Sequence, residues 1–326
     1  MTTIKQFPGF FQTAWTIVRK LGAIWWIVAS LYFASGLISP GMFQVSQAIN
    51  IFQVAAFLGV VATGQTIALL TGGIDLSVAG VVTMANIVST SVMSGRPGNM
   101  LTAVMVCLLL AAAVGLINGL IITIARVTPL VATLGMNSIL FGAALVYTGG
   151  APHGGISPDF AVFGQGHFGP LPVSSICWLS IVLAVAFLTR RTIFGRELYA
   201  VGANATAARM MGVAVNQIVI AAYVLSAIMA VLGGLLLTSY IGSPSLGIGD
   251  QFLLTSIAAT VVGGTALSGG IGSVIETVGG TLFITELNSF TNIVHVSTGV
   301  QFVLQGTVIA LSVLMYRVIG FYRTAN

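Results

Sequence analysis

Residues 21–74 read LGAIWWIVASLYFASGLISPGMFQVSQAINIFQVAAFLGVVATGQTIALLTGGI and contain no Asp, Glu, Lys or Arg. A helix needs ~20 apolar residues to cross the hydrocarbon core of a bilayer, whereas a spanning strand needs ~10 of alternating character. This run is too long and too uniformly apolar for strands. Because backbone groups in lipid must bond within their own segment, the run predicts membrane-spanning helices. Further charge-free runs cover 76–95, 97–125, 127–158, 160–189, 210–249 and 287–316.

The composition of the whole chain supports the same interpretation. Of its 326 residues, 57% are hydrophobic and 5% are charged, against ~25% charged residues in soluble domains. Disordered chains are polar, so disorder is excluded as well. The net charge of +5 is dispersed between apolar runs and forms no basic stripe, so it predicts no nucleic-acid partner. We therefore predict an all-α, polytopic membrane protein surrounded by lipid, with residues 1–326 forming one transmembrane domain.

Turn signals divide the runs into about ten spans, each close to the length that a bilayer requires. If the N-terminus is cytoplasmic, every Lys and Arg except Arg96 falls on the cytoplasmic side, which is the positive-inside pattern. Both termini are therefore expected in the cytoplasm. The first span is interpreted as an uncleaved helix, because the region before it is long for a signal peptide. We expect spans near 21–38, 49–70, 77–94, 100–125, 130–148, 173–189, 217–241, 251–267, 273–290 and 299–316.

The longest predicted cytoplasmic loop, residues 190–216, contains a candidate docking element. Residues 202–212 read GANATAARMMG and predict a short helix, which Asn204 can cap and Gly212 can end. Such a helix suits docking to a soluble partner, while a solvated positively charged loop is the alternative. The apolar face of the helix would comprise Ala207, Met210 and Met211.

Polar residues inside the spans are candidates for a translocation pathway. Asp75 is the only acid between two long apolar runs; it can cap the helix that begins near Leu76, or it can lie beside the pathway. For the uncharged residues, hydrogen bonding between helices is the alternative. Because the span centres offer no fixed counter-charge, the pattern favours a neutral solute. The uncharged candidates are Gln65, Thr66, Asn86, Asn118, Asn137 and Asn288.

Signals for catalysis or cofactor binding are not found in the sequence. It has no Gly-Lys dipeptide and hence no phosphate-binding loop of the Walker type. The three histidines are scattered without metal-ligand spacing, and Cys107 and Cys177 lie in apolar segments, where a free thiol is ordinary filler. We expect no catalytic residue, no metal site and no cofactor on this chain. Energy for any uphill transport must come from an ion or from another subunit.

Five motifs, taken together and in order, resemble the ribose-type permease family of ABC importers, which includes ribose, xylose, arabinose and galactose permeases. They are TGGIDLSV (71–78), GLING (115–119), TPLVATLGM (128–136), FGRELYAVG (194–202) followed by AAR (207–209), and GGTALSGGIGS (263–273).

The resemblance implies the pore subunit of an ATP-driven, binding-protein-dependent importer in the bacterial inner membrane, with a monosaccharide or related neutral polyol as solute. It implies three partners: an ATP-binding cassette subunit that holds ATP and Mg, a periplasmic sugar-binding protein, and a second permease chain, identical or different. Two features depart from the family pattern: residues 204–208 carry no acid, and Glu276 and Glu286 stand in the ninth span. The residues implied in coupling to the ATPase are Gly202, Asn204, Ala207, Ala208, Arg209 and Gly212.

An ion-coupled secondary transporter or channel for a small neutral solute is the alternative. It would need acidic groups near the middle of the membrane at broken helices. Asp75, Glu276 and Glu286 are the available acids, and all map toward span ends. A possible internal repeat, in which 62–74 ends LTGGI and 259–271 ends LSGGI, is short enough to arise by chance.

Overall fold

The computed structural model describes residues 22–297, 299–301, 303–308, 310–311 and 314, and within them the protein is almost entirely helical. The strands in this described part are β1 and β2, which have two residues each and pair as an antiparallel hairpin. The elements in chain order are α2 (Ala23–Ile38), the 3-10 helix η1 (Pro40–Phe43), α3 (Val45–Leu70), α4 (Val78–Met93), the 3-10 helix η2 (Pro97–Asn99), α5 (Met100–Thr123), α6 (Pro129–Thr148), α7 (Pro158–Gln165), β1 (His167–Phe168), β2 (Leu171–Pro172), α8 (Val173–Arg191), α9 (Ile193–Ala203), α10 (Ala205–Met210), α11 (Val215–Ile241), α12 (Asp250–Val262) and α13 (Val274–Ile293).

The predicted all-α membrane architecture is confirmed, and each of the first nine expected spans corresponds to a helix. Five described helices are long and apolar enough to cross a membrane: α3, α5 together with η2, α6, α8 and α11. α2, α4 and α12 are apolar but shorter, while α13 has the length but is less apolar. The described residues of the tenth expected span, 299–316, are helical. The total of ten spans, the single-domain organisation and the side of each terminus stay predictions.

Helix α12 is shorter than a full span because the chain turns early. α12 ends at Val262 and not near residue 267, because Gly264 adopts a φ of 89° and the glycine-rich segment 263–273 leaves the helix. At its other end, the loop 242–249 is held against α4, where the Gly249 N–H donates to Thr83 Oγ1 at 3.1 Å. Gly249, directly before α12, is therefore buried, while Asp250 and Gln251 at the start of the helix are exposed.

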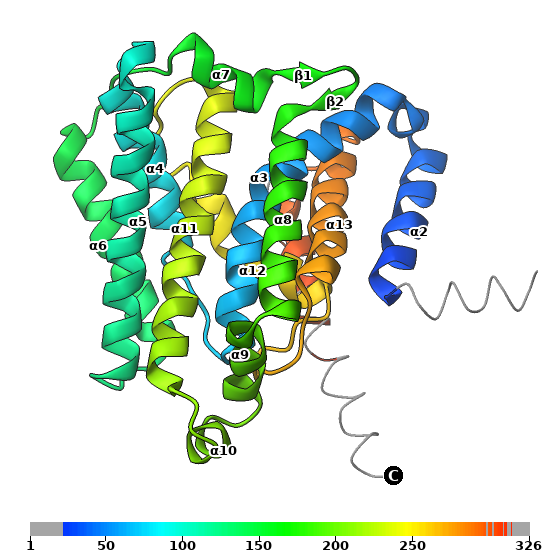
Figure 1. Cartoon of the computed structure of the whole chain (residues 1–326). Helices are drawn as coiled ribbons and strands as arrows, with labels where there is room; N and C mark the ends of the chain where they lie inside the picture. The colour runs from blue at the N-terminus through cyan, green and yellow to red at the C-terminus, as the bar shows by residue number, and fades with distance from the viewer. Residues whose placement is uncertain (1–21, 298, 302, 309, 312–313, 315–326) are drawn as a thin grey trace, which may run out of the picture.

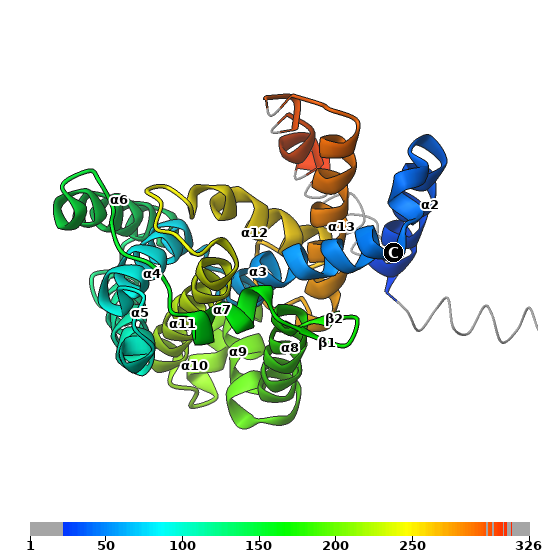
Figure 2. The same ribbon diagram turned by 90° about the horizontal axis from the view of Figure 1, so that it is seen from above.

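Helix α11 lies at the centre and packs against α3, α4 and α5 (Figure 1). Glycines make the contact with α5 close: a Cβ on Gly115 would lie 2.5 Å from the Val224 Cα, and one on Gly119 would lie 2.7 Å from the Ile220 Cα. This accounts for the GLING motif, because small residues let membrane helices approach closely. Seen from above, α6 stands at one edge of the bundle and α2 at the other (Figure 2).

The two ends of the bundle differ in charge and in structure. α9 and α10 lie at one end, called here the α10 end, while α7 and the hairpin lie at the opposite end (Figure 1). Arg126 and Arg209 line the same hollow at the α10 end, and Arg190 donates to Ser273 there. Arg96 directly precedes η2 at the other end, and η2 contacts α7. This distribution follows the predicted charge asymmetry; the expected cytoplasmic residues in 1–21 and 315–326 lie outside the described part.

Candidate functional site

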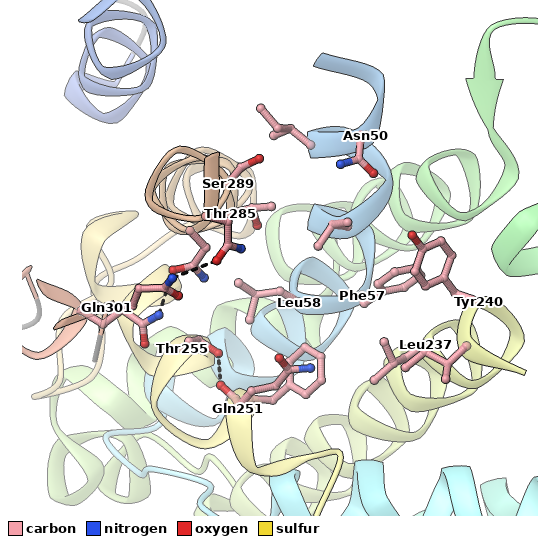
Figure 3. Close-up of a pocket in the computed structure, with 17 residues that line it drawn as sticks. Asn50, Phe57, Leu58, Leu237, Tyr240, Gln251, Thr255, Thr285, Ser289 and Gln301 are labelled. Carbon is pink, nitrogen blue, oxygen red and sulfur yellow. Dashed lines mark hydrogen bonds between the residues drawn. The ribbon is translucent and has the colours of Figure 1, made fainter. Parts of the chain in front are cut away.

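A cavity of about 390 Å³ opens between α3, α11, α12, α13 and the helical residues after 299 (Figure 3). This volume is within the ~300–1,000 Å³ typical of small-molecule sites. None of the lining residues is charged. They are Asn50, Ile51, Val54, Phe57, Leu58, Leu237, Tyr240, Ile241, Gln251, Phe252, Thr255, Thr285, Asn288, Ser289, Asn292, Gln301 and Gln305.

Carboxamide side chains form one wall of this cavity. Gln305 Nε2 donates to Asn288 Oδ1 at 2.8 Å, and Gln301 Nε2 donates to Asn292 Oδ1 at 2.8 Å. Asn288 and Asn292 are four residues apart on one helix, and Gln301 and Gln305 are four residues apart on its neighbour. The two hydrogen-bonded pairs therefore lie one helical turn apart. A carboxamide has two donor hydrogens and an acceptor oxygen, so each pair retains hydrogen-bonding capacity toward the cavity.

The opposite wall combines aromatic and amide groups. Phe57 of α3 and Tyr240 of α11 have ring centroids 5.2 Å apart, and Figure 3 shows both beside the cavity. Asn50 at the start of α3 and Gln251 at the start of α12 point toward the same space (Figure 3). An uncharged wall of amides and hydroxyls opposite aromatic rings suits a neutral solute that has both hydroxyl groups and an apolar face.

Of the predicted pathway residues, Asn288 lines this cavity and the others lie elsewhere. Gln65, Asp75 and Asn118 are buried in one network at the turn between α3 and α4. Asp75 Oδ1 accepts from the Ser77 N–H (3.0 Å) and hydroxyl (2.6 Å), and its Oδ2 accepts from the Ser226 hydroxyl (2.7 Å). Asn118 Nδ2 donates to Ser77 Oγ at 2.9 Å.

Gln65 completes the network through the backbone of Asp75. With its amide oriented to satisfy both of its polar atoms, Nε2 donates to the Asp75 carbonyl at 3.0 Å and Oε1 accepts from the Asp75 N–H at 3.3 Å. Thr66, one residue on, shares a hydrogen bond with Thr277 of α13 at 2.7 Å. These groups form hydrogen bonds at the turn between α3 and α4 and between α3 and α13. They thus have the alternative role, hydrogen bonding between helices, rather than lining a pathway.

The start of α4 is capped by side chains from a neighbouring helix. The Asp75 carboxylate accepts from the N–H of Ser77, directly before the helix, as its capping interpretation requires. Thr133 Oγ1 accepts from the Leu76 N–H at 3.0 Å, and Asn137 Oδ1 accepts from the Gly80 N–H at 2.7 Å. The first N–H groups of a helix have no acceptor within it, so side chains of α6 supply hydrogen-bond acceptors at the start of α4.

Asn86, the last of the six uncharged candidates, holds the loop between α11 and α12. Its Nδ2 donates to Thr238 Oγ1 (3.1 Å) and to the Ser243 carbonyl (3.2 Å), and its Oδ1 accepts from the Ser245 N–H (2.7 Å). Asn86 thereby fixes the segment that positions Gln251 at the cavity. A pathway role for these residues stays a prediction.

The candidate docking loop folds as two helices rather than one. The predicted helix over 202–212 is broken at Asn204, whose φ of −164° is extended, so Gly202 belongs to α9. The predicted cap is present: Asn204 Oδ1 accepts from the Ala207 N–H at 3.0 Å. Gly212, with a φ of 85°, follows the end of α10, as the sequence indicates.

Helix α10 presents an apolar surface to its surroundings. Met210 is 84% exposed and Met211 is 74% exposed. Ala207 is also exposed, while Ala208 is buried and anchors the helix on the bundle. Arg209 lies between the alanines and the methionines and is exposed. The surface of α10, defined by Ala207, Arg209, Met210 and Met211, is thus without a cover in the described part of the chain.

Comparison with known proteins assigns the family. Residues 47–313 match the family described as branched-chain amino acid transport system / permease component. The chain is 35% identical over 311 residues to the ribose import permease of Escherichia coli K12, covering 94% of this chain and 95% of the relative. It is 34% identical over 304 residues to the ribose import permease of Bacillus subtilis 168, covering 92% and 94%.

The chain belongs to this permease family. It is also 30% identical over 312 residues to the galactose/methyl galactoside import permease of Haemophilus influenzae, covering 90% of this chain and 93% of the relative. No solved structure matches it. The chain is accordingly a multi-pass permease subunit of the bacterial inner membrane.

The two acids that depart from the family pattern have distinct surroundings in this permease. Glu276 lies in the first turn of α13, where a carboxylate is favoured by the helix dipole. Glu286 is buried between α13 and α2 and accepts from the Ser35 hydroxyl at 3.4 Å. Neither lines the cavity. In the described residues, no group of three or more His, Cys, Asp and Glu is placed to hold a metal ion.

Several cavity residues of the permease escaped the sequence reasoning. Gln301 and Gln305 are four residues apart, and so are Asn292 and the predicted Asn288; this spacing is a signal that could have identified the carboxamide wall. Asn50 and Gln251 gave no such signal, because each stands alone near the start of a helix and resembles an ordinary loop residue. In the sequence, Tyr240 resembles the tyrosines that are common at membrane–water interfaces, so it did not indicate a cavity.

Proposed function

We propose that this permease forms the membrane pathway of an ATP-driven importer for a neutral monosaccharide or a related polyol. The observation that carries the proposal is the uncharged cavity with its carboxamide wall. The names of the relatives, which are ribose and galactose import permeases, support a sugar as solute.

The chemistry of the cavity favours a hydroxyl-rich solute without net charge. Amides both donate and accept, so they can exchange hydrogen bonds with hydroxyl groups as the solute moves. A charged group leaving water would require a fixed counter-charge, because burying an unpaired charge is costly. The lining residues supply none. Weak, exchangeable bonds also suit transport, since the solute must leave the site again.

The family description names branched-chain amino acids, which makes them the competing solute class. A free amino acid carries an ammonium and a carboxylate group, and each would need a charged or strongly oriented partner when desolvated. Among the lining residues the only partners are neutral amides and hydroxyls. This disfavours amino acids and supports a sugar.

Three partners complete the proposed importer. An ATP-binding cassette subunit docks on the α10 surface and holds ATP and Mg, so this chain itself binds no cofactor and is not an enzyme. A periplasmic sugar-binding protein delivers the solute to the cavity end, and a second permease chain completes the membrane assembly. The exposed Met210 and Met211 support docking at α10, because large apolar side chains beside a water-facing helix normally meet a partner.

The proposal places the α10 end in the cytoplasm and the cavity mouth in the periplasm. The arginines at the α10 end support this orientation through the positive-inside rule. An ion-coupled transporter is the alternative. It is disfavoured because Asp75 accepts three hydrogen bonds within the protein, so that its carboxylate is occupied by structural donors.

Reconstitution tests the proposal. The permease is placed in proteoliposomes with its ATPase and binding protein, and uptake of labelled monosaccharides, polyols and leucine is measured with and without ATP. ATP-dependent uptake of a sugar or polyol, without uptake of leucine, is expected. Uptake of leucine, or sugar uptake driven by an ion gradient without ATP, would overturn the proposal.

A further inference from the structure

Three glycine-containing segments that are far apart in sequence meet at the α10 end. They are the end of α3 with its following turn, the end of α9, and the loop between α12 and α13. We call their meeting point the glycine junction and define it by Leu70, Gly72, Gly202, Gly269 and Gly270.

The contacts at the glycine junction are made by backbone atoms. The Gly270 N–H donates to the Leu70 carbonyl at 3.0 Å. A Cβ added to Gly202 would collide with that same carbonyl oxygen and with the Gly270 nitrogen. A Cβ added to Gly269 would lie 2.7 Å from the Gly72 nitrogen and 3.0 Å from the Gly202 carbonyl oxygen. No side chain fits between the three segments.

Backbone conformation fixes glycine at the same places. Gly72, Gly269 and Gly270 have φ values of 82°, 87° and 73°, which other residues adopt only with strain. The junction therefore has a single close-packed arrangement and no flexible side chain that could absorb a displacement. Interfaces of this kind move as a unit or switch, because close packing is not continuously deformable.

Side-chain hydrogen bonds join α8 and α9 to the third segment. Tyr199 Oη donates to the Gly272 carbonyl at 2.8 Å, and Arg190 donates to Ser273 Oγ at 2.8 Å. Burial raises the pKa of Tyr199, so its hydroxyl keeps the proton that it donates. The Tyr199 bond holds the end of α9 against the loop, and the Arg190 bond holds the end of α8 against it.

The junction connects the α10 surface to the helices that line the cavity. α9 passes through Asn204 directly into α10. Of the other two segments, one ends α3 and the other leads into α13. At their far ends, α3 carries Asn50 and α13 carries Asn288, and both residues line the cavity. A helix is stiff along its axis, so a displacement at one end reaches the other.

We propose that Gly202 is a positioning residue for transport, acting through the glycine junction to carry movement of α10 to the cavity helices α3 and α13. This rests on the proposed function, because it takes α10 to be the surface on which the ATPase acts. Gly202 lies in α9, outside both the cavity lining and the α10 surface. Its role is to let α9 contact the α3 and α13 segments without an intervening side chain.

The test compares two variants with a matched control in the reconstituted complex. Gly202→Ala inserts a methyl group into the junction, and Tyr199→Phe removes one hydrogen bond while it preserves volume. Gly135→Ala is the control, because a Cβ at Gly135 of α6 meets nothing within 4 Å. For each protein, ATP hydrolysis and solute uptake are measured together, and the readout is solute imported per ATP hydrolysed.

We expect Gly202→Ala to hydrolyse ATP but to import about tenfold less solute per ATP, as is typical of mutations that disturb coupling. Tyr199→Phe should lower the ratio about threefold, in line with one hydrogen bond. Gly135→Ala should keep the wild-type ratio. If Gly202→Ala does not reach the membrane, Tyr199→Phe decides the matter alone.

The proposal would be overturned by a wild-type ratio for Tyr199→Phe together with any one of three results for Gly202→Ala. These results are a wild-type ratio, a parallel loss of hydrolysis and uptake, or failure to reach the membrane. Failure of the proposed function is separately visible. If the wild-type complex imports a different solute class, the proposed substrate is wrong, while the same ratio measured with that solute still tests Gly202.

Discussion

The network around Asp75 and the cavity around Asn288 are both polar regions in a predominantly apolar bundle, but their side chains are used differently. Asp75 has both carboxylate oxygens occupied by donors from Ser77 and Ser226. Asn288 has its oxygen paired with Gln305 and lines the open cavity. The comparison teaches that saturation of hydrogen bonds, and not polarity, separates a structural group from a candidate transport group.

The largest expected effect is on the closed network. Asp75→Ala leaves the Ser77 N–H and the Ser226 hydroxyl buried without an acceptor, so the free energy of unfolding should fall by about 3 kcal/mol. Thermal or denaturant unfolding of the purified permease in detergent measures this. Asp159→Ala on the exposed start of α7 is the control. Equal stability of the two variants would show that the network is not structural.

A matched pair of glutamines makes the comparison sharper. Gln65→Leu removes the pairing with the Asp75 backbone and should lower the free energy of unfolding by about 2 kcal/mol. Gln251→Leu, on an exposed residue at the cavity, should change that free energy by less than about 0.5 kcal/mol. Both variants are compared with wild type in the same unfolding experiment. Similar losses would remove the distinction between the two regions.

A smaller effect is expected at the carboxamide wall. Asn288→Leu keeps the size of the side chain but removes its hydrogen bonds, so solute uptake should fall about fivefold, the equivalent of one hydrogen bond. Uptake in proteoliposomes and thermal unfolding are measured side by side. Unchanged uptake would mean that the cavity wall does not contact the solute. A large loss of stability would place Asn288 with the structural group instead.

The last prediction concerns topology and tests on which side of the membrane the cavity opens. Single cysteines replace Asp159 and Ala205, both exposed, in a background without Cys107 and Cys177. An impermeant maleimide applied to spheroplasts should label position 159 and not position 205, because α7 lies at the cavity end and α10 at the arginine-rich end. The reverse pattern would invert the predicted topology.

The helices were predictable from sequence because a bilayer enforces them. A charge-free run such as 21–74 has no alternative in lipid, and Asn204 was recognisable as a helix cap from its neighbours alone. The cavity was not predictable in the same way, because Asn50, Gln251 and Gln305 come together only through tertiary packing. Gly202 was placed in the wrong helix, since the extended conformation of Asn204 divides the loop.

The similar endings LTGGI and LSGGI have a physical basis that the sequence could not reveal. The structure brings them into contact: a Cβ on Gly269 would lie 2.9 Å from the Gly72 Cα, and both glycines have positive φ values. The same local demand, a tight turn without a side chain, explains why the two stretches look alike. A common origin is not needed to account for the similarity.

The short helix α12 also bears on the electrical work of moving a solute across the membrane. Its 13 residues span about 20 Å, against a hydrocarbon core of about 30 Å. The cavity lies at its first residues, Gln251 and Phe252, so an open recess adjoins the start of this short helix. The neutral solute proposed here would pass this region without electrical work, because it carries no net charge on which the membrane voltage acts.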